Sequence, residues 1–187
     1  MTATLTSASR APAAARVRRA RPSDIPALAA LIRHYSEQGI LLPRSEQDLR
    51  KAVADFRIIA EKRTIIACAV LRLYTPKVAE LRSLAVAPER RGAGLGRRIV
   101  AAILREARAR NLDMVFAFTY EVDFFARAGF APIDRALVPW KAWRDCRLCP
   151  KQDCCDEIAV ARWLKAPEAG TKHFAPAFPI LNNHNIL

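Results

Sequence analysis

The first part of the chain carries apolar residues at the spacing of an amphipathic helix. The apolar face consists of Ile25, Leu28, Leu31, Ile32 and Tyr35. Ser23-Asp24 followed by Pro26 is typical of a helix start, and Gly39 is typical of a stop. Before this helix, Val17 alternates with arginines as an edge strand would. The pattern therefore predicts a short strand and then a helix.

A second, shorter helix is predicted behind Ser45. The Ser45 hydroxyl and the Asp48 carboxylate stand at the spacing of a helix-capping arrangement. The inner face of this helix would be Leu49, Val53 and Phe56.

Three strands are expected to follow. Segments 57–61 and 64–74 are rich in Ile, Val and Leu and are separated by the charged pair Lys62-Arg63, which predicts an antiparallel hairpin. Residues 79–86 alternate apolar and polar side chains, as a further strand does.

The next segment predicts a long amphipathic helix, because apolar residues recur every four positions. These positions are Leu95, Ile99, Ile103 and Ala107. A strand at 114–119, a short helix at 123–128 and a closing strand at 130–138 are expected after it. This order of elements favours an α/β (α+β) domain with one mixed sheet and helices on both of its faces.

The length of the chain, 187 residues, suits one domain and leaves little room for a second of similar size. We expect a disordered basic lead at 1–15 and a single domain at 16–164. A cysteine-containing extension would begin at about residue 140, and residues 165–187, which show no period, would form a flexible tail.

The formal charge of +13 predicts a positive surface field that attracts phosphates, nucleic acid or anionic small molecules. The cysteines number five, and no apolar signal segment is visible, so we expect reduced thiols in the cytoplasm. No stretch approaches the roughly 18 apolar residues of a membrane helix. An organellar transit peptide is the alternative interpretation of the arginine-rich start.

The most informative motif is the passage Arg91-Gly92-Ala93-Gly94-Leu95-Gly96 between a strand and the long helix. Alternate glycines let backbone amides turn toward one point, and the first helical turn adds unpaired amides and a positive dipole end. This combination predicts a pyrophosphate cradle. The spacing matches neither the Gly-x-Gly-x-x-Gly fingerprint nor the Gly-Lys-Ser/Thr loop. The alternative is a tight turn with no ligand.

The motif Arg91-x-x-Gly94-x-Gly96 after the strand at 81–86, with the later segment 124–130 that ends in Gly-Phe, resembles the GNAT superfamily of N-acetyltransferases. The resemblance spans about residues 16–139. It implies a mixed, mostly antiparallel sheet and acetyl-CoA as co-substrate.

The same resemblance implies which residues meet acetyl-CoA. The turn would hold the pyrophosphate, and the preceding strand would hold the pantetheine arm and the thioester. Arg97 borders the turn together with Arg90 and Arg98. These arginines could bind the remaining phosphate of coenzyme A, or they could simply form the solvated face of the helix. The implied set is Leu84, Ala85, Val86, Arg91, Gly92, Ala93, Gly94, Leu95, Gly96 and Arg97.

The chemistry needs a neutral amine, a route for its proton and stabilisation of the oxyanion, and none of these demands a metal. Many relatives place a tyrosine acid where this chain has Phe125. Tyr120 is a nearby phenol, and Glu80 and Glu121 could relay the amine's proton. We take Glu80 and Tyr120 as the catalytic candidates, with packing, capping or solvation as the alternative.

A narrower resemblance concerns the acceptor. Segments 39–45, 80–86 and 141–159 resemble the short bacterial N-acetylglutamate synthases, which acetylate glutamate at the entrance to arginine synthesis. The resemblance implies that Arg44 and Arg82 bind the substrate carboxylates, for which guanidinium groups are well suited. The alternative for both is an exposed surface charge.

Four cysteines cluster near the end of the predicted domain: Cys146, Cys149, Cys154 and Cys155. We interpret them as reduced thiols of an extension that packs near the active site, so that no metal is assigned. A zinc site built on Cys146, Cys149 and Cys155, or a redox role for the first pair, is the alternative. Cys68, within an apolar strand, is expected in the core.

Two rival functions stay open. One is acetylation of another amine: a protein N-terminus, a lysine or a small molecule. Cationic acceptors would be repelled by a protein of charge +13, which favours an anionic amino acid. The other is a basic nucleic-acid-binding module, although no motif of that class is present. No membrane partner is expected, and a homodimer is one option for assembly.

Overall fold

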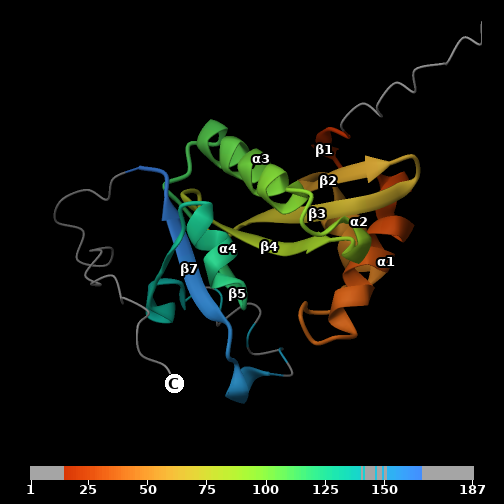
Figure 1. Ribbon diagram of the computed structural model, residues 1–187. Helices are drawn as coiled ribbons and strands as arrows, with labels where there is room; N and C mark the ends of the chain where they lie inside the picture. The colour runs from red at the N-terminus through yellow and green to blue at the C-terminus, as the bar shows by residue number, and fades with distance from the viewer. Residues whose placement is uncertain (1–14, 140, 142–145, 147–148, 150, 166–187) are drawn as a thin grey trace, which may run out of the picture.

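The computed structural model describes residues 15–139, 141, 146, 149 and 151–165 (Figure 1). The predicted basic lead, apart from Ala15, and the predicted tail, apart from Lys165, lie outside the described residues. None of the helices in the described part is long and apolar enough to span a membrane.

A seven-stranded open sheet in the order β1-β2-β3-β4-β5-β7-β6 forms the centre of the fold. The strands are β1 (Val17–Arg19), β2 (Phe56–Glu61), β3 (Thr64–Leu73), β4 (Val78–Val86), β5 (Met114–Thr119), β6 (Ala131–Pro132) and β7 (Ile158–Trp163). Only β4 and β5 pair in parallel; all other neighbours are antiparallel. The predicted mixed, mostly antiparallel sheet is confirmed.

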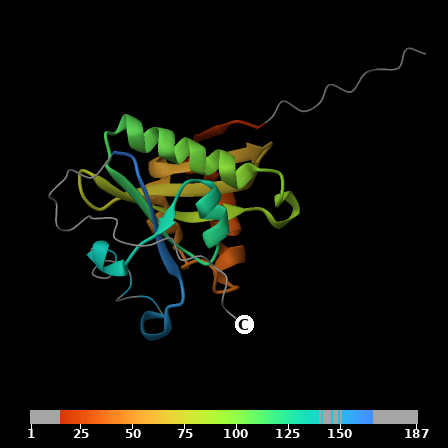
Figure 2. The ribbon, with the colours of Figure 1, turned by 60° about the vertical axis from the view of Figure 1, so that its left-hand side comes forward.

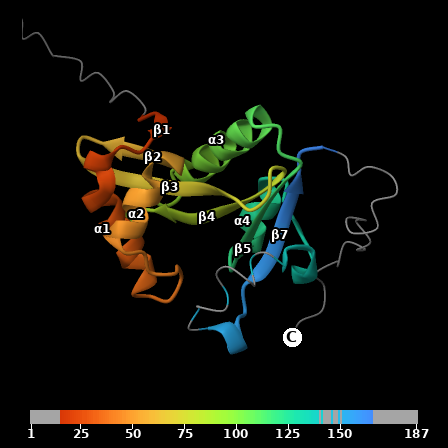
Figure 3. The same ribbon diagram turned by 180° about the vertical axis from the view of Figure 1, so that it is seen from behind.

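Within the described residues, four α-helices with defined bounds cover the sheet. They are α1 (Ile25–Ser36), α2 (Glu46–Ala52), α3 (Leu95–Ala109) and α4 (Val122–Arg127). Helices α1 and α2 lie on one face, and α3 and α4 on the other (Figures 1 and 3). Helix α3 crosses β2, β3 and β4 (Figure 2). Short 3-10 turns include η1 (Pro22–Asp24), η2 (Val53–Asp55), η3 (Pro88–Arg90), η4 (Arg135–Leu137) and η6 (Gln152–Cys154).

The capping of α2 follows the sequence, but its length does not. Ser45 is the N-cap, and its hydroxyl oxygen accepts the Asp48 amide at 3.1 Å. The predicted inner face was wrong beyond Leu49, because the helix ends at Ala52 and Phe56 opens β2. Phe56 is nevertheless buried, as an apolar side chain would be on the inner face of a helix or of a strand.

Strand β4 contains an irregularity that shapes the site. Cys68 pairs with Ala85 and Val70 with Arg82, so β4 has one residue more than β3 over this stretch. Ser83 lies within it at a φ of +52°, a left-handed value for a residue with a side chain. Strand β4 pairs with β5 only over 78–80, and beyond this the two strands separate (Figure 1).

The C-terminal part of the sheet differs from the prediction. The expected strand at 130–138 is only Ala131–Pro132, since proline lacks an amide donor and the Asp134 side chain caps η4 through the Ala136 amide. Strand β7 was not predicted as a strand. It fills the place between β5 and β6, and its sequence contains the strand-favouring residues Ile158, Val160 and Trp163.

The main hydrophobic core joins the sheet to α1 and α3, and includes the large buried side chains Ile32, Phe56, Ile58, Leu81 and Ile103. A smaller cluster lies around β5 and β7 and consists of Val78, Met114, Phe116, Val138 and Ala161. The rigid sheet therefore fixes the place where β4 and β5 separate.

Candidate active site

A cavity of about 1020 Å³ lies where β4 and β5 separate. Its walls come from β4, the glycine turn with the start of α3, the end of β5, α4, the region after α1 and the residue before β7. Its lining residues are Tyr35, Ile40, Leu41, Leu81, Arg82, Ser83, Leu84, Ala85, Val86, Arg90, Arg91, Gly92, Gly94, Leu95, Gly96, Arg97, Phe118, Thr119, Tyr120, Glu121, Phe124, Phe125, Arg127 and Glu157.

The structure brings nine of the ten predicted acetyl-CoA residues into this lining; Ala93 is the exception. Gly92 and Gly94 have φ values of +78° and +72°, which explains the need for glycine at both positions. Gly94 is the N-cap of α3, and its carbonyl accepts the Arg98 amide at 3.1 Å.

The backbone amides of this turn are available to a ligand. Among the backbone hydrogen bonds of the described residues, none is donated by the amides of Gly92 or of residues 94–97. The 15-residue helix α3 adds the positive end of its dipole at the same place. These unpaired donors are what a diphosphate requires.

Tyr35 of α1 supports the end of β4. Its buried hydroxyl donates a hydrogen bond to the Val86 carbonyl and so fixes the end of β4 from helix α1. On the β3 side, the Ala87 amide donates a hydrogen bond to the Ile66 carbonyl at 2.9 Å. The last residues of β4 are thereby held with one edge facing the cavity.

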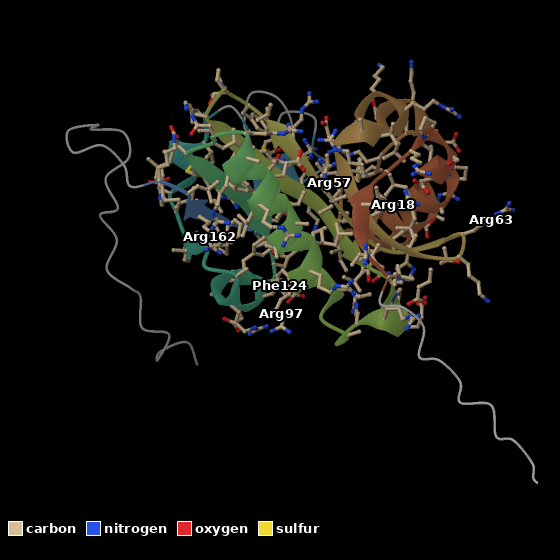
Figure 4. The ribbon with its side chains drawn as sticks, turned by 90° about the horizontal axis from the view of Figure 1, so that it is seen from above. Arg18, Arg57, Arg63, Arg97, Phe124 and Arg162 are labelled. Carbon is tan, nitrogen blue, oxygen red and sulfur yellow. The ribbon has the colours of Figure 1, made fainter. Side chains whose placement is uncertain are left out.

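The basic residues around the turn have different partners. Arg90 forms an ion pair with Glu61, and Arg98 donates to the Ala15 carbonyl. Arg97 is exposed and lines the cavity together with Arg127 of α4, and Figure 4 shows Arg97 beside Phe124. Arg97 and Arg127 are therefore placed to meet phosphate, whereas Arg98 is not part of the described lining.

Glu80 lies next to the cavity rather than in its described lining. Its carboxylate is almost fully buried and accepts a hydrogen bond from the Tyr74 hydroxyl at 2.8 Å. It pairs with Lys141 at 2.8 Å and with Arg82 at 3.7 Å. These contacts favour a role in positioning Arg82 over proton transfer. The sequence pattern gave no sign of Lys141, because its partner lies 61 positions earlier.

Arg44 and Arg82 meet at a second hollow of about 370 Å³ between α2 and the sheet. Arg72 and Lys51 add positive charge to the same lining, and Tyr74 adds a phenol. Arg82 also lines the main cavity, so it connects the two spaces. Arg82 is largely buried, with a side chain 11% exposed, which excludes the predicted alternative of a surface charge for this residue.

Tyr120 lines the cavity at the end of β5 and is 40% exposed. Its hydroxyl donates to Asp156 at 2.9 Å and accepts from the Lys151 ammonium at 3.0 Å. The Lys151 hydrogen bond lowers the pKa of Tyr120, but burial, the Asp156 hydrogen bond and the charge of Glu157 together outweigh it and raise the pKa. Tyr120 is thus held in its protonated form.

Two charged residues of the described cavity lining were not predicted as site residues. Glu157 lines the cavity just before β7, and Arg127 lines it from α4. No local pattern marks either one, because each reaches the site only through the pairing of β7 with β5 or the packing of α4.

The cysteine-rich segment lies beside the site. The Cys155 sulfur accepts from Arg135 at 3.6 Å, and the Cys149 sulfur accepts the Lys151 amide at 3.4 Å. Within the described residues, no group of three or more His, Cys, Asp or Glu side chains is gathered as a metal site. Cys68 is in the core as predicted, and burial raises its pKa to about 12.

The described residues fit acetyl-CoA. Unpaired amides and arginines at one end suit its phosphates, and the largely apolar wall of β4 suits a pantetheine arm. When bound, acetyl-CoA supplies the activated acetyl thioester.

Comparison with known proteins supports this fit. An uncharacterized N-acetyltransferase of Chlorobaculum tepidum is 38% identical over 148 residues, which cover 79% of this chain and 96% of that protein. An amino-acid acetyltransferase of Mycobacterium tuberculosis is 37% identical over 151 residues, covering 79% of this chain and 83% of that protein.

Among solved structures, N-acetylglutamate synthase from Neisseria gonorrhoeae, complexed with coenzyme A and N-acetyl-glutamate, matches with a TM-score of 0.73 at 30% identity. The match covers 83% of this chain and 36% of that one, so it concerns one part of a longer protein. Residues 27–130 match the Acetyltransferase (GNAT) family. The chain therefore belongs to this family and is an N-acetyltransferase that uses acetyl-CoA as its co-substrate.

Proposed function

We propose that this enzyme transfers the acetyl group to the α-amino group of an amino acid, and that L-glutamate is the acceptor. The observation that carries the proposal is the position of Arg82, which lines both the main cavity and the arginine-rich hollow that contains Arg44. An acceptor with two carboxylates can place its amine toward the thioester while both carboxylates contact guanidinium groups. The reaction would be the first step of arginine synthesis, in the cytoplasm.

The relatives support the same acceptor class. Amino-acid acetyltransferases and an N-acetylglutamate synthase are among the proteins that this chain resembles. The charge of +13 also favours an anionic acceptor over a lysine or a cationic small molecule.

Each side of the cavity has its own task in this proposal. The amides of Gly92 and of residues 94–97 bind the diphosphate, and the edge of β4 from Leu84 to Val86 orients the thioester. Tyr120, with its raised pKa, returns a proton to the leaving thiolate. Glu80 keeps Arg82 in place through their ion pair.

A screen of free amino acids tests the proposal. Purified protein is mixed with acetyl-CoA and each of the common amino acids, and coenzyme A is quantified by chromatography so that the protein's own thiols do not interfere. L-Glutamate should give the highest kcat/KM, and Arg91→Glu, which places an anion at the phosphate cradle, should abolish the reaction. Preference for a peptide N-terminus or for lysine would refute the acceptor assignment.

A further inference from the structure

One carboxylate in the main cavity has no task in the reaction described so far. Among the described lining residues, the acidic side chains are Glu121 and Glu157. Glu121 is exposed, whereas Glu157 is half-buried. An α-amino group is mostly protonated at neutral pH and must lose a proton before it can attack a thioester.

We propose that Glu157 is the general base of the reaction and takes that proton from the acceptor's ammonium group. The proposal rests on the proposed function, because only an amine acceptor brings this proton into the cavity.

The sheet places Glu157 at the point where β4 and β5 separate. Ile158, the next residue, pairs with Thr119 at the end of β5, so Glu157 adjoins the same end of β5 as Tyr120. Arg135 holds the backbone here: its guanidinium donates to the carbonyl of Cys155 at 3.2 Å and to the carbonyl of Glu157. The carboxylate is therefore carried by a fixed backbone into a cavity that the thioester edge of β4 also lines.

The surroundings suit a proton acceptor better at Glu157 than at Glu80. Burial raises the pKa of Glu157, and the charge of Glu80 raises it further, while Lys141, Arg135 and Lys151 oppose the shift without cancelling it. A carboxylate with a raised pKa accepts a proton more readily near neutral pH.

Glu80, by contrast, already forms an ion pair with Lys141 at 2.8 Å. Tyr120, whose pKa the charge of Glu157 raises, is a further polar residue of the cavity lining.

The proton balance needs no further reagent. One ammonium proton passes to the Glu157 carboxylate, and the neutral nitrogen attacks the carbonyl carbon. The N–C bond forms, the C–S bond breaks, and the thiolate sulfur takes the phenol proton of Tyr120. The second proton lost by the nitrogen then restores the phenol. Glu157 then releases its proton to water.

The test compares Glu157→Gln with Glu46→Gln, which removes an exposed carboxylate outside both described cavity linings and serves as the control. kcat/KM is measured with acetyl-CoA and L-glutamate from mildly acidic to alkaline pH. Glu157→Gln should lower kcat/KM at neutral pH by about 100-fold or more. Its rate should recover toward alkaline pH, where the amine loses its proton to water. Glu46→Gln should stay within about threefold of the wild type, and coenzyme A binding by calorimetry should be the same in all three proteins.

Two results would overturn the assignment. The first is that Glu157→Gln has the wild-type kcat/KM. The second is that Glu157→Gln has a lower kcat/KM but a pH profile of the wild-type shape, which a merely structural role predicts. Glu157→Asp, which keeps the carboxylate, should restore the acidic limb of the profile even if its rate is low. A wild-type enzyme that acetylates no amino acid would instead remove the proposed function itself, which is a separate outcome.

Discussion

The guanidinium of Arg91 lies against Tyr35: Nε donates a hydrogen bond to the phenol oxygen at 3.3 Å, and Cζ is 5.3 Å from the ring centroid. The same hydroxyl donates to the Val86 carbonyl. Tyr35 of α1 therefore connects both acetyl-CoA elements, the end of β4 and the glycine turn.

Tyr35→Phe should weaken acetyl-CoA binding and leave the acceptor side intact. The substitution keeps the ring but removes two hydrogen bonds, each worth about 1 kcal/mol, so the KM for acetyl-CoA should rise about 5- to 30-fold. Tyr74→Phe is the matched control, because the Tyr74 hydroxyl bonds to Glu80 beside Arg82 and should affect the acceptor KM instead. Steady-state kinetics with each substrate varied will check this, and equal effects of both variants on both KM values would contradict it.

Gly96→Ala should damage the same site by a different route. A Cβ at Gly96 would lie 3.1 Å from Cε2 of Phe124, so α3 and α4 could no longer pack as closely. We expect a several-fold higher Kd for coenzyme A, measured by calorimetry.

The matching double-mutant cycle decides the cause. Adding Phe124→Ala should restore coenzyme A binding to the Gly96→Ala variant. It should not restore binding to Gly92→Ala, because a Cβ at Gly92 would meet nothing within 4 Å. The cost of Gly92→Ala, about 1 kcal/mol or more, comes instead from the φ of +78° at this position. Strict additivity at Gly96 would show that the packing argument is wrong.

Helices and turns could be predicted because their signals are local. The apolar period ending at Tyr35, the Ser45 cap and the glycines at 92 and 94 each appear within a few residues, and the structure has the expected element at each.

The errors and omissions involve residues whose partners are distant in sequence. Strand β7 depends on its pairing with β5. The left-handed conformation of Ser83 could not be predicted, because Ser83 lies within a segment that alternates like an ordinary strand. Glu80 and Arg82 alternate with apolar residues as solvent-facing residues would. Both are largely buried because Lys141, Tyr74 and helix α2 cover that face of the sheet. The cofactor-side residues could therefore be predicted from a motif, whereas Arg44 and Arg82 were predicted only from the resemblance to N-acetylglutamate synthases.

Arg44→Ala and Arg82→Ala should each raise the KM for L-glutamate at least tenfold and change the KM for acetyl-CoA much less. The loss of one charge-assisted contact to a carboxylate costs about 1.5 to 3 kcal/mol, which corresponds to that factor. Arg63→Ala is the charge-matched control, because Arg63 is exposed at the β2–β3 corner and points away from the domain (Figure 4). If all three variants behave alike, only the overall charge matters.

Tyr120→Phe should lower kcat by about 100-fold if the phenol supplies the thiolate proton. The donor must be protonated, and its pKa is raised, so activity that depends on it should fall only above the ordinary tyrosine pKa of about 10. Lys151→Gln removes the contact that lowers this pKa and should move the alkaline fall to higher pH. Asp156→Asn removes a contact that raises it and should move the fall to lower pH. Shifts in the same direction would exclude Tyr120 as the titrating group.

The buried ion pair between Arg57 of β2 and Glu106 of α3 should contribute more to stability than an exposed ion pair does. Their side chains are only 8% and 11% exposed, and Arg110 adds a contact to Glu106 at 2.5 Å. Glu106→Gln leaves the buried Arg57 guanidinium without its counter-charge, which should lower the free energy of unfolding by about 3 to 5 kcal/mol. Glu46→Gln breaks the exposed Arg50–Glu46 pair, with side chains 65% and 55% exposed, and should cost less than about 0.5 kcal/mol. Urea unfolding of the two variants measures the difference. Equal losses would mean that burial does not strengthen the Arg57–Glu106 contact, and that α3 is held on the sheet by its apolar face alone.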